Sequence, residues 1–139
     1  MAAYHPRFVR TSIALRPASV LLAATLLLAA CGGGSPSGSV ECRSAVNGEL
    51  TITADDLAFD TACIALPADE AVTLILVNDD TDPHNVAIWT DSSKGTELFG
   101  GEIVDGGETI EYEVPAMEAG TFYFDCEVHP AMNGSVVVE

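Results

Sequence analysis

The C-terminal part of the chain is TFYFDCEVHPAMNGSVVVE, residues 121–139. Residues 121–124 are aromatic or β-branched, as is typical of a strand, and residues 135–138, a serine followed by three valines, form a second strand-like run. Between these runs, Pro130 and the pair Asn133-Gly134 indicate a loop and a turn. The stretch therefore predicts a strand, a short loop and a second strand that meet at one end of a β-sheet.

The loop carries three residues whose side chains bind soft metal ions, Cys126, His129 and Met132, and a further histidine, His84, lies far upstream. A thiolate, two imidazoles and a thioether are the ligand set of a mononuclear electron-transfer copper, with the Met as a weak axial donor. A lone surface histidine is the alternative interpretation of His84. Of the three histidines in the chain, however, only His84 and His129 follow residue 31. We therefore predict a site for one copper ion.

The spacing C-x2-H-x2-M, with Pro130 after the second histidine, resembles the short ligand loop of amicyanin-type cupredoxins, the small blue copper proteins. Residues 83–86, Pro-His-Asn-Val, resemble the His-Asn segment of the same family. The resemblance extends over residues 50–139. One position departs from the family pattern, because Asp125 precedes the cysteine where plastocyanins carry a tyrosine that offers electrons an aromatic route.

The resemblance implies a type 1 copper site with His84, Cys126 and His129 as equatorial ligands and Met132 as the axial ligand. It also implies that Asn85 ties the two ligand-bearing segments together. Electrons would leave through His129, whose ring edge we expect near solvent.

The remainder of the chain predicts an all-β, Greek-key sandwich of about seven to eight strands. Alternating or β-branched runs cover residues 50–53, 71–77, 86–90 and 109–114, with turn residues between them. Residues 94–102 remain ambiguous between a short helix and a bulged edge strand. We expect Trp89, Tyr112 and Tyr123 in the core, and Met117 in the core or at its rim, since packing is favoured over Cu(I) binding for this residue. Asp79, Asp80 and Asp82 lack the spacing of a calcium loop and predict a solvated turn.

Residues 1–30 predict a lipoprotein signal peptide. Three arginines precede the apolar run at 20–30, which is too short for the about 20 residues that span a bilayer but suits a secretory signal. Residues 28–31, Leu-Ala-Ala-Cys, resemble a bacterial lipobox, which implies a lipid on Cys31 and a location outside the cytoplasm, anchored to the cell membrane. An ordinary secreted cysteine is the alternative. Residues 31–39 predict a Gly/Ser tether with a reach of roughly 15 Å, followed by the copper-binding domain at 40–139.

With Cys31 assigned to lipid and Cys126 to metal, Cys42 and Cys63 remain. In an exported protein such a pair favours a disulfide bond. A second metal site is the alternative, but no histidine or third cysteine lies near the pair in the sequence.

The chain after residue 31 is strongly acidic. It contains all 21 acidic residues and two of the five basic ones, which gives a formal charge of −19. This balance argues against binding to nucleic acid or to anionic lipid. Two explanations remain open: solubility or adaptation to salt, and electrostatic steering toward a basic redox partner.

Three functions remain as hypotheses. The first is a membrane-anchored, monomeric electron carrier that serves redox proteins such as a basic c-type cytochrome or an oxidase or reductase. The second is copper delivery or homeostasis, which often uses open sites rich in Met and His that this chain lacks. The third is a copper enzyme, which would need further copper sites and further histidines. We predict an electron carrier and no enzyme.

Overall fold

The structure is a computed structural model that describes residues 41–139. The signal peptide predicted at 1–30, the tether at 31–39 and the lipid site at Cys31 lie outside the described residues. Within residues 41–139, no helix is long and apolar enough to cross a membrane.

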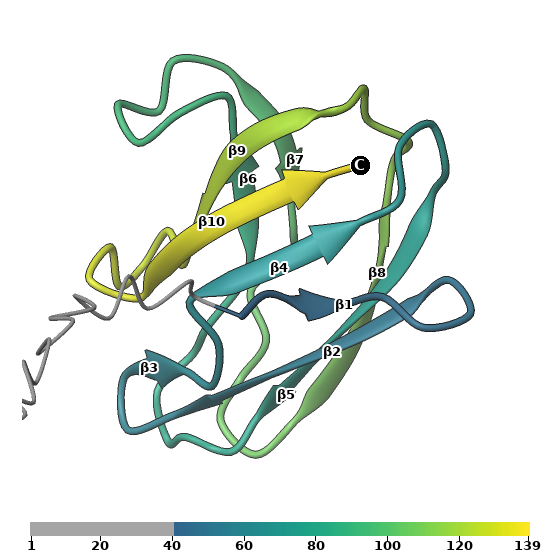
Figure 1. Ribbon diagram of the computed structural model, residues 1–139. Coiled ribbons are helices and arrows are strands. Elements are labelled where there is room, and N and C mark those ends of the chain that lie inside the picture. The colour runs from purple at the N-terminus through teal and green to yellow at the C-terminus, as the bar shows by residue number, and fades with distance from the viewer. Residues whose placement is uncertain (1–40) are drawn as a thin grey trace, which may run out of the picture. The chain divides into compact units, whose positions relative to one another are not determined.

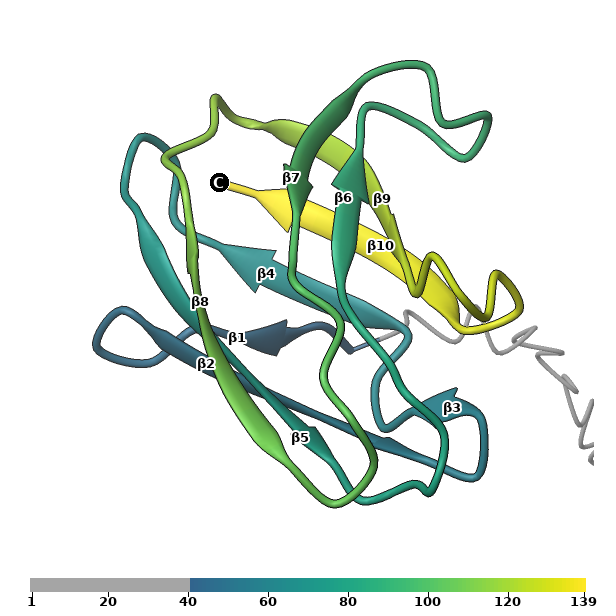
Figure 2. The same cartoon turned by 180° about the vertical axis from the view of Figure 1, so that it is seen from behind.

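The described residues form two packed β-sheets (Figures 1 and 2). The larger sheet has the order β1 (Arg43–Ser44), β4 (Cys63–Leu66), β10 (Asn133–Val138), β9 (Gly120–Asp125), β6 (Ala87–Trp89) and β7 (Glu97–Gly100). The smaller sheet has the order β3 (Ala58–Phe59), β2 (Glu49–Asp55), β5 (Val72–Asn78) and β8 (Thr109–Val114).

The all-β sandwich predicted from the sequence is confirmed, with ten strands in the described residues instead of seven to eight. Two of the additional strands, β1 and β3, contain only two residues each, too few to give a pattern in the sequence. The ambiguous segment at 94–102 contains the edge strand β7, and the neighbouring strand β6 has a register shift between Ile88 and Trp89. The edge-strand interpretation of this segment was therefore the right one.

The core lies between the two sheets and follows from side-chain alternation. Along β5, the residues at 72, 74, 76 and 78 are buried and those between them are half-buried. Tyr112 and Met117 are buried as expected. Trp89 and Tyr123 are only half-buried, so the core prediction was wrong for them. Their neighbours Ile88 and Phe124 take the core positions, and a strand turns alternate side chains to opposite faces.

The metal-binding residues predicted from the sequence gather at one end of the sandwich. The loop at 126–132 connects β9 to β10, and His84 lies in the connection from β5 to β6. The turn between β2 and β3 reaches the same place, because the backbone N–H of Leu57 donates to Oδ2 of Asp80 at 2.8 Å. We call this end of the domain, with residues 126–132, His84 and the β2–β3 turn, the ligand end.

The predicted disulfide bond between Cys42 and Cys63 is present, and it joins the residue before β1 to the first residue of β4. The two cysteines are 21 residues apart in the sequence. In the chain-entropy model, closing a loop of this size stabilises the fold by about 3 kcal/mol. The bond fixes the beginning of the described chain to the larger sheet.

Candidate metal centre

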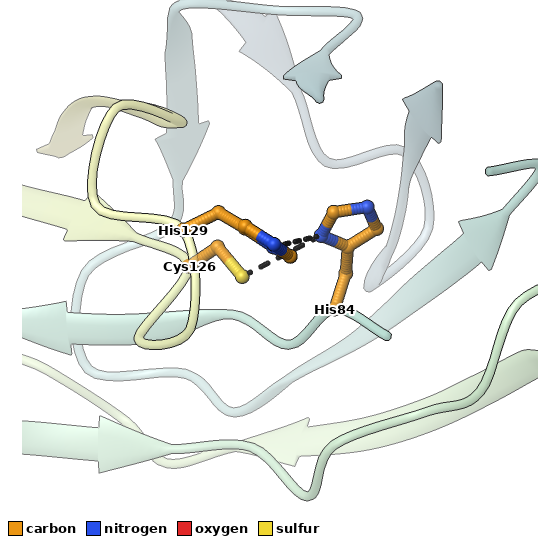
Figure 3. Close-up of side chains that lie close together, drawn as sticks. All are labelled: His84, Cys126 and His129. Carbon is orange, nitrogen blue, oxygen red and sulfur yellow. Dashed lines mark hydrogen bonds between the residues drawn. The ribbon is translucent and has the colours of Figure 1, made fainter. Parts of the chain in front are cut away.

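Three side chains from two distant segments converge at the ligand end (Figure 3). Nδ1 of His84 lies 3.6 Å from Sγ of Cys126 and 3.1 Å from Nδ1 of His129. One ligand atom from each residue lies within 4.8 Å of the others. Two imidazole nitrogens and a sulfur atom at such distances can share one metal ion.

The site is enclosed on all but one side. His84 and Cys126 have no exposed surface, Met132 is 2% exposed, and His129 is partly exposed. Cys126 is the free cysteine of the described residues. Met132 belongs to the core cluster, so the thioether of this residue lies on the buried side of the loop.

The ligand loop is closed by hydrogen bonds among the three ligand residues themselves. The N–H of Cys126 donates to the carbonyl of Met132 at 3.0 Å, the N–H of His129 to Cys126 at 3.2 Å, and the N–H of Met132 to His129 at 2.9 Å. Asn133 adds donations from Nδ2 to the carbonyls of Pro130 and Ala131, both at 3.0 Å. This short sequence therefore contains the groups that fold it into a tight loop.

Gly134 allows β10 to leave the loop close to its neighbours. A Cβ at this position would lie 2.5 Å from the carbonyl oxygen of Ala62 and 2.5 Å from Cε1 of Phe124. Only glycine fits such a close approach. The turn signal Asn133-Gly134 in the sequence thus has a packing reason in addition to its turn conformation.

His84 is held by one group that is distant in the sequence, Val104, and by one from its own turn, Asp80. Its backbone exchanges two hydrogen bonds with Val104, at 3.0 and 2.8 Å. Its Nε2 lies 3.2 Å from Oδ2 of Asp80. A neutral imidazole that donates from Nε2 to a carboxylate leaves the lone pair of Nδ1 free for a metal ion.

Asp80 was predicted only as part of a solvated turn, and its contact with His84 was missed. Hydrogen bonds from the backbone of Leu57, from His84 and from the backbone of Thr81 hold the pKa of Asp80 well below its ordinary value. The buried Asn78 shapes this turn, since its Oδ1 accepts from the N–H of Asp80 and its Nδ2 donates to the carbonyl of Asp82. The charged carboxylate is therefore fixed beside the ring of His84.

Asn85 connects the two segments that carry the ligands. Its Oδ1 accepts from the N–H of Glu127 at 2.9 Å, and its Nδ2 donates to Oε2 of Glu127 at 2.7 Å and to the carbonyl of Gly101 at 3.0 Å. The side chain is fully buried. These bonds place the residue after His84 directly against the residue after Cys126.

A buried charge that the sequence does not predict lies on the outer face of the larger sheet, at the residue before Cys126. The carboxylate of Asp125 is fully buried, accepts from Nε1 of Trp89 at 2.9 Å, and pairs with Nζ of Lys94 at 2.5 Å. Nζ of Lys94 also lies 5.1 Å from the centre of the Trp89 ring. The bond with Asp125 raises the pKa of Lys94 above its ordinary value. No sequence signal links position 94 to position 125.

Comparison with known proteins agrees with this geometry. Residues 18–138 match the family model described as "Cupredoxin-like domain". The chain belongs to this cupredoxin family. Auracyanin-A of Chloroflexus aurantiacus is 26% identical to it over 151 residues, covering 86% of this chain and 93% of that protein. Amicyanin of Paracoccus versutus is 36% identical over 67 residues, which cover 48% of this chain and 48% of that protein.

The solved structures give the same fold. The structure of auracyanin A from Chloroflexus aurantiacus, described as a "blue" copper protein, has a TM-score of 0.58 and 21% identity, covering 69% of this chain and 99% of that one. At this identity the likeness concerns the fold.

The donor set of this cupredoxin also fits copper on chemical grounds. A thiolate with two imidazoles and a nearby thioether favours copper in a type 1 geometry over metal ions that prefer oxygen ligands.

Proposed function

We propose that this protein is an electron carrier that binds one copper ion through Nδ1 of His84, Sγ of Cys126 and Nδ1 of His129, with Met132 as a weak axial donor. The observation that carries the proposal is the convergence of these three ligand atoms within 4.8 Å of one another. When bound, the copper ion supplies a one-electron couple between Cu(II) and Cu(I).

The surroundings of the ligands suit this role because they resist movement. Asp80 and Val104 hold His84, and Asn85 fixes the distance between the two segments. The hydrogen bonds inside the loop at 126–132 restrain Cys126 and His129. A frame that holds its ligands in one geometry limits the rearrangement that accompanies a change between Cu(II) and Cu(I).

His129 is the group through which we propose that electrons enter and leave. It is the partly exposed member of the three converging residues, while His84 and Cys126 are fully buried. Two large apolar side chains are exposed at the ligand end, Val128 at 42% and Leu57 at 50%. Together with the acidic surface they suit brief contact with a redox protein that carries basic residues, such as a c-type cytochrome or an oxidase or reductase.

We further propose that the protein works outside the cytoplasm, attached to the cell membrane by a lipid on Cys31. The disulfide bond between Cys42 and Cys63 supports an oxidising compartment. The signal peptide at 1–30 and the Gly/Ser tether at 31–39 supply the route and the anchor.

The test is a titration of the metal-free protein with Cu(II), followed by visible absorption. We expect an intense blue charge-transfer band that saturates at one copper per chain. Cys126→Ser should abolish the band, because a hydroxyl cannot replace the Cu–S bond. Met117→Leu is the matched control, since this buried methionine lies outside the site and a volume-conserving change should leave the titration unaltered. A colourless complex of the native protein would instead favour copper delivery.

A further inference from the structure

The described chain begins at the ligand end of the domain. Cys42 is joined to Cys63 by the disulfide bond, and β1 then runs parallel to β4, with Arg43 opposite Ile64. Strand β4 in turn runs parallel to β10, with Cys63 opposite Ser135. Because β10 starts at the ligand loop, β4 and β1 also start at the ligand end (Figure 1).

The junction lies close to the metal-binding residues. The N–H of Ser135 donates to the carbonyl of Ala62 at 3.0 Å, and Ser135 is the third residue after Met132. The disulfide at Cys63 is one residue from this contact. The disulfide bond that fixes the beginning of the domain therefore lies beside the ligand loop.

The other end of the chain lies at the opposite end of the sheet. Strand β10 ends at Val138, and the N–H of Glu139 donates to the carbonyl of Leu66, the last residue of β4. The six residues of β10 correspond to about 20 Å between the two ends. Figure 2 shows the C-terminus far from the ligand loop.

We propose that the lipid-anchored protein turns its ligand end toward the membrane that holds it, and exchanges electrons there with a cationic redox protein seated in the same membrane. The proposal rests on the copper site and the lipid on Cys31 given under Proposed function. Ten residues separate Cys31 from Cys42, and the Gly/Ser tether predicted from the sequence would let a stretch of this length span roughly 17 Å. This is no longer than the about 20 Å between the two ends of β10, so we expect the junction and the ligand loop to stay nearer to the membrane than the C-terminal end does.

The charges at this end select a protein partner over the lipid surface. Asp55, Asp56, Asp79, Asp82 and Glu127 are exposed at the ligand end, Asp55 as the last residue of β2 and the others on loops. The two basic residues of the described chain are both paired with carboxylates, Arg43 with Asp60 at 2.7 Å and Lys94 with Asp125 at 2.5 Å. Anionic phospholipid therefore repels the ligand end, whereas a basic docking face attracts it.

The test compares two ways of anchoring the same copper protein to vesicles. One form is the natural protein with lipid on Cys31. The other carries Cys31→Ala and is attached through a cysteine added after Glu139, on a Gly/Ser spacer of matched length, to a maleimide lipid. The vesicles are phosphatidylcholine with a small fraction of a lipid whose headgroup is a cationic ruthenium(II) ammine complex. Each Ru(II) gives one electron to one Cu(II) and becomes Ru(III), and the loss of blue colour reports the rate.

We expect the natural form to be reduced at least fivefold faster than the form anchored at its C-terminus. A soluble ruthenium(II) ammine complex should reduce both forms at equal rates, which shows that their copper sites are alike. Equal rates with the lipid-bound donor would overturn the proposal. A protein that never turns blue would instead contradict the proposed copper function, so the two failures are distinguishable.

A second donor lipid separates a cationic partner from the lipid surface itself. With an anionic one-electron donor as headgroup, the advantage of the natural form should shrink, because the acidic ligand end is repelled. An equally large advantage with the anionic donor would mean that the ligand end lies on the lipid irrespective of charge, and the proposal of a cationic partner would be wrong.

Discussion

The two segments that carry the metal-binding residues are held in place in different ways. The loop at 126–132 is closed by its own hydrogen bonds, in which Cys126, His129 and Met132 bond to one another. His84 instead depends on Asp80, on Val104 and, through its neighbour Asn85, on Glu127. One half of the site is therefore a local structure and the other half is assembled by the fold. This difference predicts which changes the site tolerates.

The largest effect should come from removing each imidazole in turn. Both His84→Gly and His129→Gly should lose the blue colour, because each removes an equatorial ligand. Added imidazole should restore the colour of His129→Gly, since His129 is partly exposed and leaves a hole open to solvent, but not of His84→Gly, since His84 is fully buried. Visible absorption during a titration with imidazole measures this. Equal rescue of both variants would show that the two ligands are equally accessible.

The strand end before the loop also depends on a distant partner, and this can be tested by unfolding. Lys94→Met leaves the buried carboxylate of Asp125 without its cation, which should lower the free energy of unfolding by about 3 kcal/mol. Arg43→Met is the matched control. Its pair with Asp60 is 38% exposed on both sides, and the loss should stay below about 1 kcal/mol. Urea denaturation of the metal-free forms gives both values, and losses of equal size would remove the special role of the buried pair.

A smaller effect is expected where the two segments meet. Asn85→Ala removes three hydrogen bonds at a buried position and should cost about 2 kcal/mol of unfolding free energy. Asn133→Ala is the control within the loop, since the exposed Asn133 bonds only to carbonyls at 130 and 131. It should cost less than about 1 kcal/mol. If Asn133→Ala lowered the free energy of unfolding as much as Asn85→Ala, the link between the two segments would not be more important than the bonds within the loop.

The smallest effect should arise at Asp80. Asp80→Asn preserves the size of the side chain and a possible hydrogen bond to Nε2 of His84, but it removes a negative charge. Because a negative charge near the ligand stabilises Cu(II) over Cu(I), the reduction potential should rise while the blue colour remains. Asp82→Asn, an exposed change without contact to His84, is the control for general surface charge. Cyclic voltammetry of the native protein and the two variants measures the potentials. A fall in the potential of Asp80→Asn would contradict the stabilisation of Cu(II) by the charge of Asp80.

The same contrast explains how far the sequence could predict the site. The strands β5, β8 and β10 were recognisable because alternation and β-branched residues are local signals. The ligand loop was recognisable for the same reason, since three of its side chains lie within seven residues. The link from Lys94 to Asp125 was not, because it exists only after segments distant in the sequence pack together. Asp80 and His84 are only four residues apart, but their contact depends on the shape of the turn, which hydrogen bonds from Leu57 and to Asn78 help to set. Trp89 was misplaced because hydrophobic character does not reveal which face of a strand a residue occupies.

The disulfide bond at the beginning of the described chain also determines how the domain bears mechanical load. A pull on the N-terminal segment passes through Cys42 into Cys63 and thus into β4, which lies between β1 and β10 in the larger sheet. Because β1, β4 and β10 are parallel, a force directed along them would shear their hydrogen bonds together instead of opening them one after another. The two residues of β1 cannot be peeled away first, because the covalent bond carries the strain past them. For a protein anchored through Cys31 as proposed, a pull from the membrane would therefore reach the larger sheet through β4 and not through β1 alone.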